Sequence, residues 1–279
     1  MKKFKLDLFI KIMGIGSASG LIYNNEILYV ISDNSHYLYE YAIETADLKK
    51  HILIENSEVN ENVPKKQKAD FEAITQFEDD IFVVGSGSKE NRQKMIQISE
   101  ATKTVLQNHD LTDLYLNMQS FSGISAEDFN IEGVIFTGEI WYFFQRGNGK
   151  SGRNGIFTVN DKYFTQGYSL FYNEYKLPKI NGVRGTFTDA ILVDHTFYFL
   201  ATAEDSQSTY LDGTILGSSL GTINAETMKL KKTVTISNKN KFEGITLYKN
   251  LDKSIEFLLC EDQDNDLMES QIYKLTLNK

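Results

Sequence analysis

Cysteine, proline and tryptophan are scarce in this sequence. Its 279 residues include one cysteine, Cys260, two prolines and one tryptophan. A single cysteine excludes an internal disulfide bond and any zinc site that needs several cysteines. Such usage is typical of proteins in a reducing compartment. We therefore predict a cytoplasmic protein.

Long apolar runs and flexible linkers are also missing. Lys5, Asp7 and Lys11 interrupt the N-terminal segment, so it lacks the unbroken apolar core of an export signal. No other stretch is apolar for long enough to span a bilayer, and we expect no membrane partner. Because no segment rich in proline, glycine or serine divides the chain, we predict one domain over residues 1–279.

Positive charge is in deficit. The formal net charge is −9, and lysine and arginine do not gather into a stripe that also carries aromatic residues. A nucleic-acid partner needs a basic face that neutralises phosphates. We therefore expect no nucleic-acid partner and predict a small-molecule ligand, whereas the composition indicates no particular oligomeric state.

What the sequence does contain is a repeat. An acidic residue is followed by a small residue and then by alternating apolar positions, each time after a polar loop. The pattern occurs at residues 70–74, 130–134, 187–191 and 241–245, and at 18–22 with Ser19 in place of the acid. The small residues at positions 20, 73, 133, 190 and 244 are 53, 60, 57 and 54 residues apart. Such regular spacing predicts repeated structural units.

Each unit reads as a group of β-strands. In each unit the acid-small pattern, which we call the anchor, is followed by a turn, an apolar run and further alternating segments. Three or four strands per unit predict a single all-β propeller with five blades, and six blades if a degenerate one lies in the longest interval. The last unit is one strand short, and the alternating segment Phe4–Ile10 can supply that strand and close the ring. The small anchor residues let innermost strands approach one another.

This topology gathers polar side chains at one mouth of the central channel. The start of the first strand and the end of the second lie at the same end of an antiparallel blade. Four acidic residues stand at strand starts, and we take them as catalytic candidates and metal-ligand candidates: Glu72, Glu132, Asp189 and Glu243. Ligand-binding candidates at strand ends are Asp33, Ser86, Gln145, Glu204 and Glu261.

Arginine is used sparingly and in one region. The chain has four arginines against 25 lysines, and all four are predicted in loops at the same end of the blades. The arginine guanidinium forms bidentate hydrogen bonds with carboxylates and phosphates. We therefore predict a catalytic role for Arg146 and ligand-binding roles for Arg92, Arg153 and Arg184.

Two interpretations of the acidic ring stay open. The acids can form a structural network with arginines and backbone N–H groups, or they can hold Ca²⁺ or Mg²⁺, since several carboxylates on one axis resemble a hard-ion cage. No organic cofactor is indicated, because the loop at residues 149–151 lacks the first glycine of a phosphate-binding loop. Residues 111–118 have helical spacing, and we expect this helix to overhang the mouth as a lid.

Several motifs resemble those of a bacterial family of predicted β-propellers with no assigned activity. They include Lys68-Ala69-Asp70-Phe71-Glu72-Ala73, Asn130-Ile131-Glu132-Gly133, Phe144-Gln145-Arg146-Gly147, Thr188-Asp189-Ala190 and the segment from Ala203-Glu204-Asp205 to Tyr210. The resemblance spans nearly the whole chain and implies the propeller fold.

Two functions fit these features. The first is a divalent-cation-dependent hydrolase of a small ester, lactone or phosphoester, in which the four acids act as ligands or bases and Arg146 and Arg184 neutralise developing charge. The alternative is a module that binds a sugar or anionic metabolite without turnover. Both use the same residues, and they differ in turnover and metal dependence.

Overall fold

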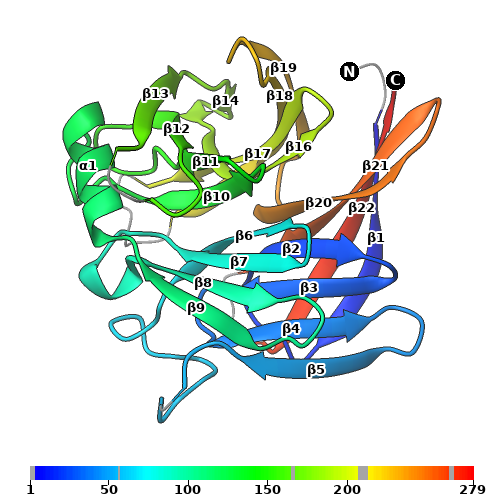
Figure 1. The fold of residues 1–279 in the computed structure, drawn as a ribbon. Coiled ribbons are helices and arrows are strands. Elements are labelled where there is room, and N and C mark those ends of the chain that lie inside the picture. Colours follow the sequence, from blue (N-terminus) through cyan, green and yellow to red (C-terminus); the bar gives the residue numbers. More distant parts are fainter. Residues whose placement is uncertain (1–3, 56, 165–166, 207–212, 264–266) are drawn as a thin grey trace.

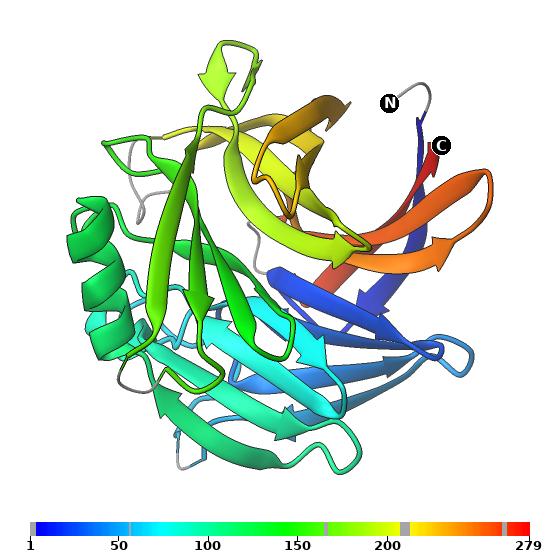
Figure 2. The ribbon, with the colours of Figure 1, turned by 45° about the horizontal axis from the view of Figure 1, so that its top comes forward.

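Five four-stranded antiparallel sheets form a closed ring in the computed structural model (Figures 1 and 2). The structure describes residues 4–55, 57–164, 167–206, 213–263 and 267–279, and Tyr210 of the quoted motif lies outside them. Each sheet is one blade, so the predicted five-bladed propeller is confirmed. No sixth four-stranded blade is present among the described residues.

The first four blades each follow the chain from the axis outward. Blade one contains β2 (Ala18–Asn24), β3 (Ile27–Ser32), β4 (Tyr37–Ala42) and β5 (Asp47–Ile52). Blade two contains β6 (Phe71–Phe77), β7 (Asp80–Gly85), β8 (Lys94–Ser99) and β9 (Val105–Asp110). Blade three contains β10 (Ile131–Phe136), β11 (Ile140–Gln145), β12 (Asn154–Asn160) and β13 (Ser169–Tyr175). Blade four contains β16 (Thr186–Val193), β17 (Thr196–Asp205), β18 (Thr214–Asn224) and β19 (Leu230–Ser237).

The fifth blade joins the two ends of the chain. It contains β20 (Phe242–Asn250), β21 (Ser254–Glu261), β22 (Glu269–Asn278) and, as its outer strand, β1 (Phe4–Met13). β1 pairs antiparallel with β22 from Phe4 opposite Leu277 to Met13 opposite Glu269. The predicted closure by the N-terminal strand is therefore confirmed, and it covers an edge that β22 would otherwise expose.

Every innermost strand carries a β-bulge near its start. The register of β2, β6, β10, β16 and β20 against the neighbouring strand skips one residue there: Ser19, Glu72, Glu132, Thr188 or Glu243. A bulge turns a side chain away from the regular alternation of the strand. Each blade therefore has one bulged residue near the start of its innermost strand, and its side chain departs from the regular alternation of that strand.

Small residues follow most bulges because the inner strands crowd together. A Cβ atom on Gly244 would lie 2.9 Å from the Cα atom of Gly20, and one on Gly133 would lie 3.1 Å from the Cα atom of Asp189. The first contact would require the backbone to shift, and the second is tighter than nearly all contacts of real Cβ atoms, so the predicted steric role is confirmed at these two positions.

The core lies between the blades. The largest cluster packs blade two against blade three and contains Trp141, stacked on Phe136 with ring centroids 4.0 Å apart. Aromatic pairs of this kind contribute about 0.5–1.5 kcal/mol beyond their buried area. Each remaining cluster joins another pair of neighbouring blades, so the blades stabilise one another around the ring.

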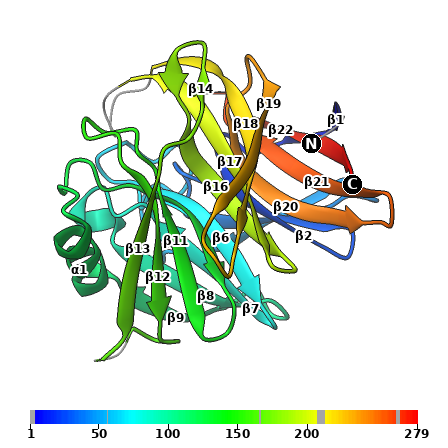
Figure 3. The same ribbon diagram turned by 90° about the horizontal axis from the view of Figure 1, so that it is seen from above.

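Two short helices and a small hairpin interrupt the blades. The hairpin pairs β14 (Lys179–Ile180) with β15 (Val183–Arg184), and a turn of 3₁₀ helix spans Glu90–Arg92. The predicted helix is present as α1 (Thr112–Ser122). Its buried face packs into the core of blades two and three, and it lies at the rim of the ring (Figure 3). The prediction of a lid over the mouth is therefore wrong, because the apolar spacing reflects packing on the blades.

Among the described residues, no helix combines the length and apolarity needed to cross a bilayer.

Candidate active site at one mouth of the central channel

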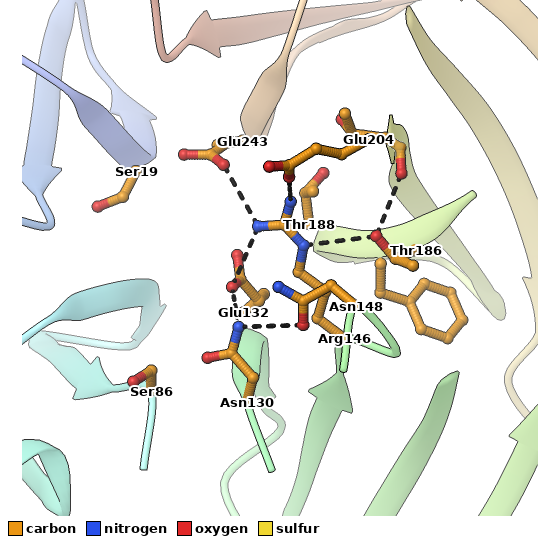
Figure 4. Close-up of polar contacts among 12 residues, drawn as sticks. Ser19, Ser86, Asn130, Glu132, Arg146, Asn148, Thr186, Thr188, Glu204 and Glu243 are labelled. Atoms are coloured by element: carbon orange, nitrogen blue, oxygen red, sulfur yellow. Dashed lines mark hydrogen bonds and ion pairs between the residues drawn. The ribbon is translucent and has the colours of Figure 1, made fainter. Parts of the chain in front are cut away.

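The five bulged residues surround the axis at one mouth of the channel. Figure 4 shows Glu132 and Glu243 on either side of the Arg146 guanidinium, and Ser19 on another blade of the ring. Two of the five residues carry hydroxyls that join neighbouring blades. Ser19 donates a hydrogen bond to the carbonyl of Phe71 at 2.6 Å, and Thr188 donates one to the carbonyl of Phe242 at 2.7 Å. The other three bulges carry glutamates, which bring negative charge to the axis.

Arg146 is the central cation of this mouth. It follows β11, its side chain is 6% exposed, and it lies 2.7 Å from Glu204, 3.3 Å from Glu132 and 3.5 Å from Glu243. Burial lowers the pKa of a guanidinium, but the three carboxylates outweigh burial and raise the pKa of Arg146. Arg146 therefore holds side chains from three blades together while it stays charged.

Lys241 extends this network in blade five. Its ammonium lies 3.0 Å from Glu243 and 2.9 Å from Asp262. Burial raises the pKa of the Glu243 carboxyl well above its usual value, although Lys241 opposes this. In the same blade, the Asn240 side chain donates to Glu261 at 2.7 Å. We call the set of Glu132, Arg146, Glu204, Lys241, Glu243, Glu261 and Asp262 the Arg146 network.

A second charged cluster lies between blades one and two. Asp70 is 2.7 Å from the Lys68 ammonium and 2.6 Å from the Arg92 guanidinium, and it accepts a hydrogen bond from Ser86 at 2.5 Å. Burial raises the pKa of Asp70, but Lys68 and Arg92 outweigh burial and lower it. Lys68 also pairs with Asp33. Asp70 is thus held as an anion whose oxygens already have partners.

Glu72 differs from the other bulge carboxylates. Its side chain is partly exposed, and its carboxyl group has no ion pair or hydrogen bond in the part of the chain that the structure describes. Burial, together with the nearby charges of Glu132, Asp70 and Asp33, raises its pKa well above the usual value. Glu72 therefore combines a raised pKa with the lack of a partner among the described residues.

Asp33, Asp70 and Glu72 form a group that could hold a metal ion. One oxygen from each lies within 4.8 Å of the others. Asp33 Oδ1 is buried and has no hydrogen-bond partner among the described residues, although Asp33 Oδ2 pairs with Lys68. Both oxygens of Asp70 have partners, in Lys68, Arg92 and Ser86. A cation bound here would therefore draw mainly on Asp33 and Glu72. The four acids predicted as a metal set do not form such a group within the described residues.

Negative groups outnumber positive groups at this mouth. The two clusters described above contain eight carboxyl groups: Asp33, Asp70, Glu72, Glu132, Glu204, Glu243, Glu261 and Asp262. They contain four cations: Lys68, Arg92, Arg146 and Lys241. Burial raises the pKa values of Glu72, Glu132 and Glu243, and the surplus of negative groups adds to the cost of ionising all of them.

Asp189 does not occupy the position that the repeat gave it. The bulged residue of blade four is Thr188, and Asp189 takes the place that glycine or alanine has in the other blades. Its oxygens accept the backbone N–H groups of Ala190 and Ile245, each at 2.8 Å. The alignment of Asp189 with the three glutamates is therefore wrong, because the acid-small pattern is shifted by one residue in this blade.

The remaining predicted residues separate into two groups. Gln145 lies under the mouth, where its amide donates to the carbonyls of Asp128 and Arg146. Arg153 pairs instead with Glu174 of the outer strand β13 and donates to Ser122 at the end of α1. Arg184 donates to the carbonyl of Leu177. Arg92 and Arg146 thus reach the charged clusters, whereas Arg153 and Arg184 have other partners, and the functional roles of all four stay predictions.

Sequence reasoning left three polar residues of the site without a role. Asp70, Asn130 and Lys241 each lie two residues before a bulged glutamate. Each lies immediately before an innermost strand, next to the bulge that breaks the regular alternation, so strand periodicity gave no signal for them. Asn130 donates to Glu132 at 2.6 Å, just as Lys241 pairs with Glu243.

Comparisons with known proteins agree with this fold. Residues 14–277 match the model described as "Family of unknown function (DUF6929)". A search of curated proteins finds no match.

Solved structures with the same architecture have very different sequences. The allergen Mala s 1 of Malassezia sympodialis has a TM-score of 0.58 at 13% identity, covering 96% of each chain. The glutaminyl cyclase of Myxococcus xanthus has a TM-score of 0.55 at 7% identity, covering 98% of this chain and 97% of the other. The α-L-arabinofuranosidase of Podospora anserina, solved with cellotriose, has a TM-score of 0.53 at 10% identity, covering 95% and 92%. At such identities the likeness shows the propeller fold alone.

Proposed function

Because the chain belongs to this family of unknown function, we propose a function from its geometry: a hydrolase of a small molecule, with Glu72 as the proton-transfer residue at the axial mouth. The observation that carries the proposal is the contrast between two neighbouring carboxyl groups. The pKa of Glu72 is raised and that of Asp70 is lowered, although the two belong to one group of oxygens within 4.8 Å. Opposite shifts in neighbouring carboxyl groups are typical of acid and base assignments in enzymes.

Glu72 suits proton transfer because its carboxyl group has no hydrogen bond or ion pair with the described residues that would have to break first. A protonated carboxyl group within reach of a substrate oxygen can protonate a leaving group, and the resulting carboxylate can then accept a proton from water. Asp70 keeps its charge through Lys68 and Arg92. Its negative charge favours the protonated form of Glu72 and so holds Glu72 ready to donate.

The Arg146 network has a supporting role in this proposal. Arg146 already contacts three carboxylates and Thr186. With these partners, the guanidinium positions Glu132 and Glu243 around the mouth. It does not act by stabilising negative charge that develops on a substrate. Two of the structurally similar proteins are enzymes by name, the glutaminyl cyclase and the arabinofuranosidase, so the architecture can support catalysis.

The experiment compares hydrolysis by the wild type, Glu72→Gln and Glu226→Gln. The panel holds chromogenic esters, lactones, phosphoesters and arabinosides. Glu226 is exposed and lies next to His195, away from the described site, so Glu226→Gln is the matched control. Loss of one general acid costs about 10²–10⁴-fold in rate. We expect a loss of that size in Glu72→Gln for a hydrolysed substrate and no loss in the control.

A second candidate is metal-assisted hydrolysis by the same mouth. The buried, unpartnered Oδ1 of Asp33 favours it, because Asp33 and Glu72 would supply hard oxygen ligands for Mg²⁺ or Ca²⁺. A bound cation would polarise a substrate oxygen. Calorimetric titration with MgCl₂ and CaCl₂ tests this. Binding that Asp33→Asn abolishes supports the candidate, and activity that survives a chelator excludes it.

Binding without turnover is the remaining alternative. If the wild type hydrolyses no member of the panel, yet a sugar or anionic metabolite binds and Glu72→Gln weakens that binding, the mouth is a binding site.

The proposal also includes a cytoplasmic location, for which the support is the single buried thiol of Cys260.

A further inference from the structure

A basic cavity lies beside blade two and shares Arg92 with the charged cluster at the axial mouth. It has a volume of about 500 Å³ and is lined by Lys65, Lys66, Lys89, Glu90, Asn91 and Arg92. Cavities of about 300–1,000 Å³ hold small ligands in many proteins. The described lining contains four cationic side chains and one carboxylate, in a chain whose net charge is −9. This local reversal of charge sets the cavity apart from the acidic mouth.

The walls of the cavity are two turns that are tied together. Gln67 and Lys68 donate backbone hydrogen bonds to the carbonyl of Pro64, and Arg92 donates one to the carbonyl of Lys89. Two side chains then join the turns. The Arg92 guanidinium donates to the carbonyl of Lys65 at 2.9 Å, and the Asn91 amide donates to the carbonyl of Lys68 at 2.7 Å. The cavity is therefore formed in advance, which reduces the entropy cost of binding.

Arg92 is the buried charged side chain in the wall of this cavity. It is 3% exposed, although arginine is rarely buried to this degree. Its Nη1 group pairs with Asp70 and Ser88, whereas its buried Nε–H has no hydrogen-bond acceptor in the described part of the chain. Buried donors in proteins nearly always have an acceptor, and one that lacks it within the chain suggests an acceptor from a water or an ion.

We propose that this cavity binds a small multivalent anion of the phosphate class. Phosphate oxygens accept several charge-assisted hydrogen bonds, and arginine and lysine together provide donors in suitable geometries. The exposed lysines Lys66 and Lys89 would contact the bound anion directly, and the buried charge of Arg92 in the cavity wall would favour it. This site goes beyond the hydrolase proposed above and stands whether or not the axial mouth catalyses a reaction.

The test measures phosphate binding to the full chain by isothermal titration calorimetry. The probes are inorganic phosphate and pyrophosphate, with sodium chloride at equal ionic strength as the baseline. The test variant is the double substitution Lys66→Gln, Lys89→Gln, which removes two exposed charges from the cavity. Lys231→Gln, Lys232→Gln is the matched control, because both lysines are exposed on β19.

We expect at least one probe to bind with a Kd of about 1 mM or lower. The cavity variant should weaken that binding by at least 10-fold, and the control should change it by less than twofold. Equal melting temperatures of the two variants show that both are folded. The proposal is overturned if neither phosphate nor pyrophosphate binds at about 10 mM, which is 10-fold above the expected Kd. It is also overturned if the cavity variant and the control variant weaken binding equally.

Discussion

Replacing Arg146 with methionine should destabilise the fold more than any other substitution of a single charge at the mouth. The guanidinium is 6% exposed and contacts Glu132, Glu204 and Glu243, which are themselves at most 7% exposed. Removing one partner of a buried ion pair costs about 3–5 kcal/mol, because the other charge remains buried. Arg146→Met leaves Glu132 and Glu204 buried without this cation, whereas Glu243 keeps its ion pair with Lys241. We therefore expect a loss of at least about 3 kcal/mol in the free energy of unfolding.

The loss should depend on pH in a defined direction. Burial already raises the pKa values of Glu132 and Glu243 above their usual values in the folded protein, and Arg146 opposes this shift. Without Arg146 the folded-state pKa values rise further. A carboxyl whose folded pKa exceeds its unfolded pKa contributes stability at low pH, which is lost as pH rises through the folded value. The variant should therefore be closest to wild type near pH 5 and furthest from it near pH 8.

Urea unfolding followed by circular dichroism at both pH values measures this effect. A loss of 3–5 kcal/mol corresponds to a decrease in melting temperature of roughly 6–10 °C for a chain of this size. Arg153→Met is the control, since Arg153 and Glu174 form a pair that is 30% and 42% exposed, and exposed pairs contribute about 0–1 kcal/mol. Equal losses in the two variants, or a loss that shrinks as pH rises, would refute the role assigned to Arg146.

Three further substitutions and one deletion test the rest of the architecture. Ser19→Ala and Thr188→Val remove the hydroxyls that join neighbouring blades, and each should cost about 1 kcal/mol in the free energy of unfolding by urea titration; no loss in either would argue against these inter-blade hydrogen bonds. Removal of residues 1–13 exposes the edge of β22, and we expect aggregation by size-exclusion chromatography, whereas a stable monomer with unchanged melting temperature would contradict closure through β1. Tyr115→Phe deletes a buried hydrogen bond of 2.8 Å to the carbonyl of Gly85 and should cost about 1–3 kcal/mol. Because α1 lies at the rim, the KM of any substrate should stay constant in that variant, and a changed KM would favour a lid.

The ring could be predicted because its signal repeats. Five anchors at similar spacing indicated five blades, and the alternating segment Phe4–Ile10 indicated how the ring closes. The helix at residues 111–118 could also be predicted, but its position could not. Leu114, Tyr115 and Met118 are apolar because they pack on blades two and three, and periodicity does not reveal which surface an apolar face covers.

The site was only partly predictable, for two physical reasons. In blade four, Thr188 and Asp189 both fit the repeat, and only the strand register shows that the hydroxyl occupies the bulge. The second reason concerns lysine, which is usually a surface cation. Lys68 and Lys241 are buried beside Asp70 and Glu243, and nothing in composition distinguishes them from the other lysines.

The protonation of Glu72 is the property on which the proposed chemistry depends. It can be measured by nuclear magnetic resonance on protein labelled with ¹³C at glutamate side-chain carboxyls, with the Glu72 signal assigned by its loss in Glu72→Gln. Ordinary glutamates titrate near pH 4.3. We expect the Glu72 signal to titrate well above that value, in line with the raised pKa caused by burial and by Glu132, Asp70 and Asp33. Titration at or below pH 4.3 would contradict the account.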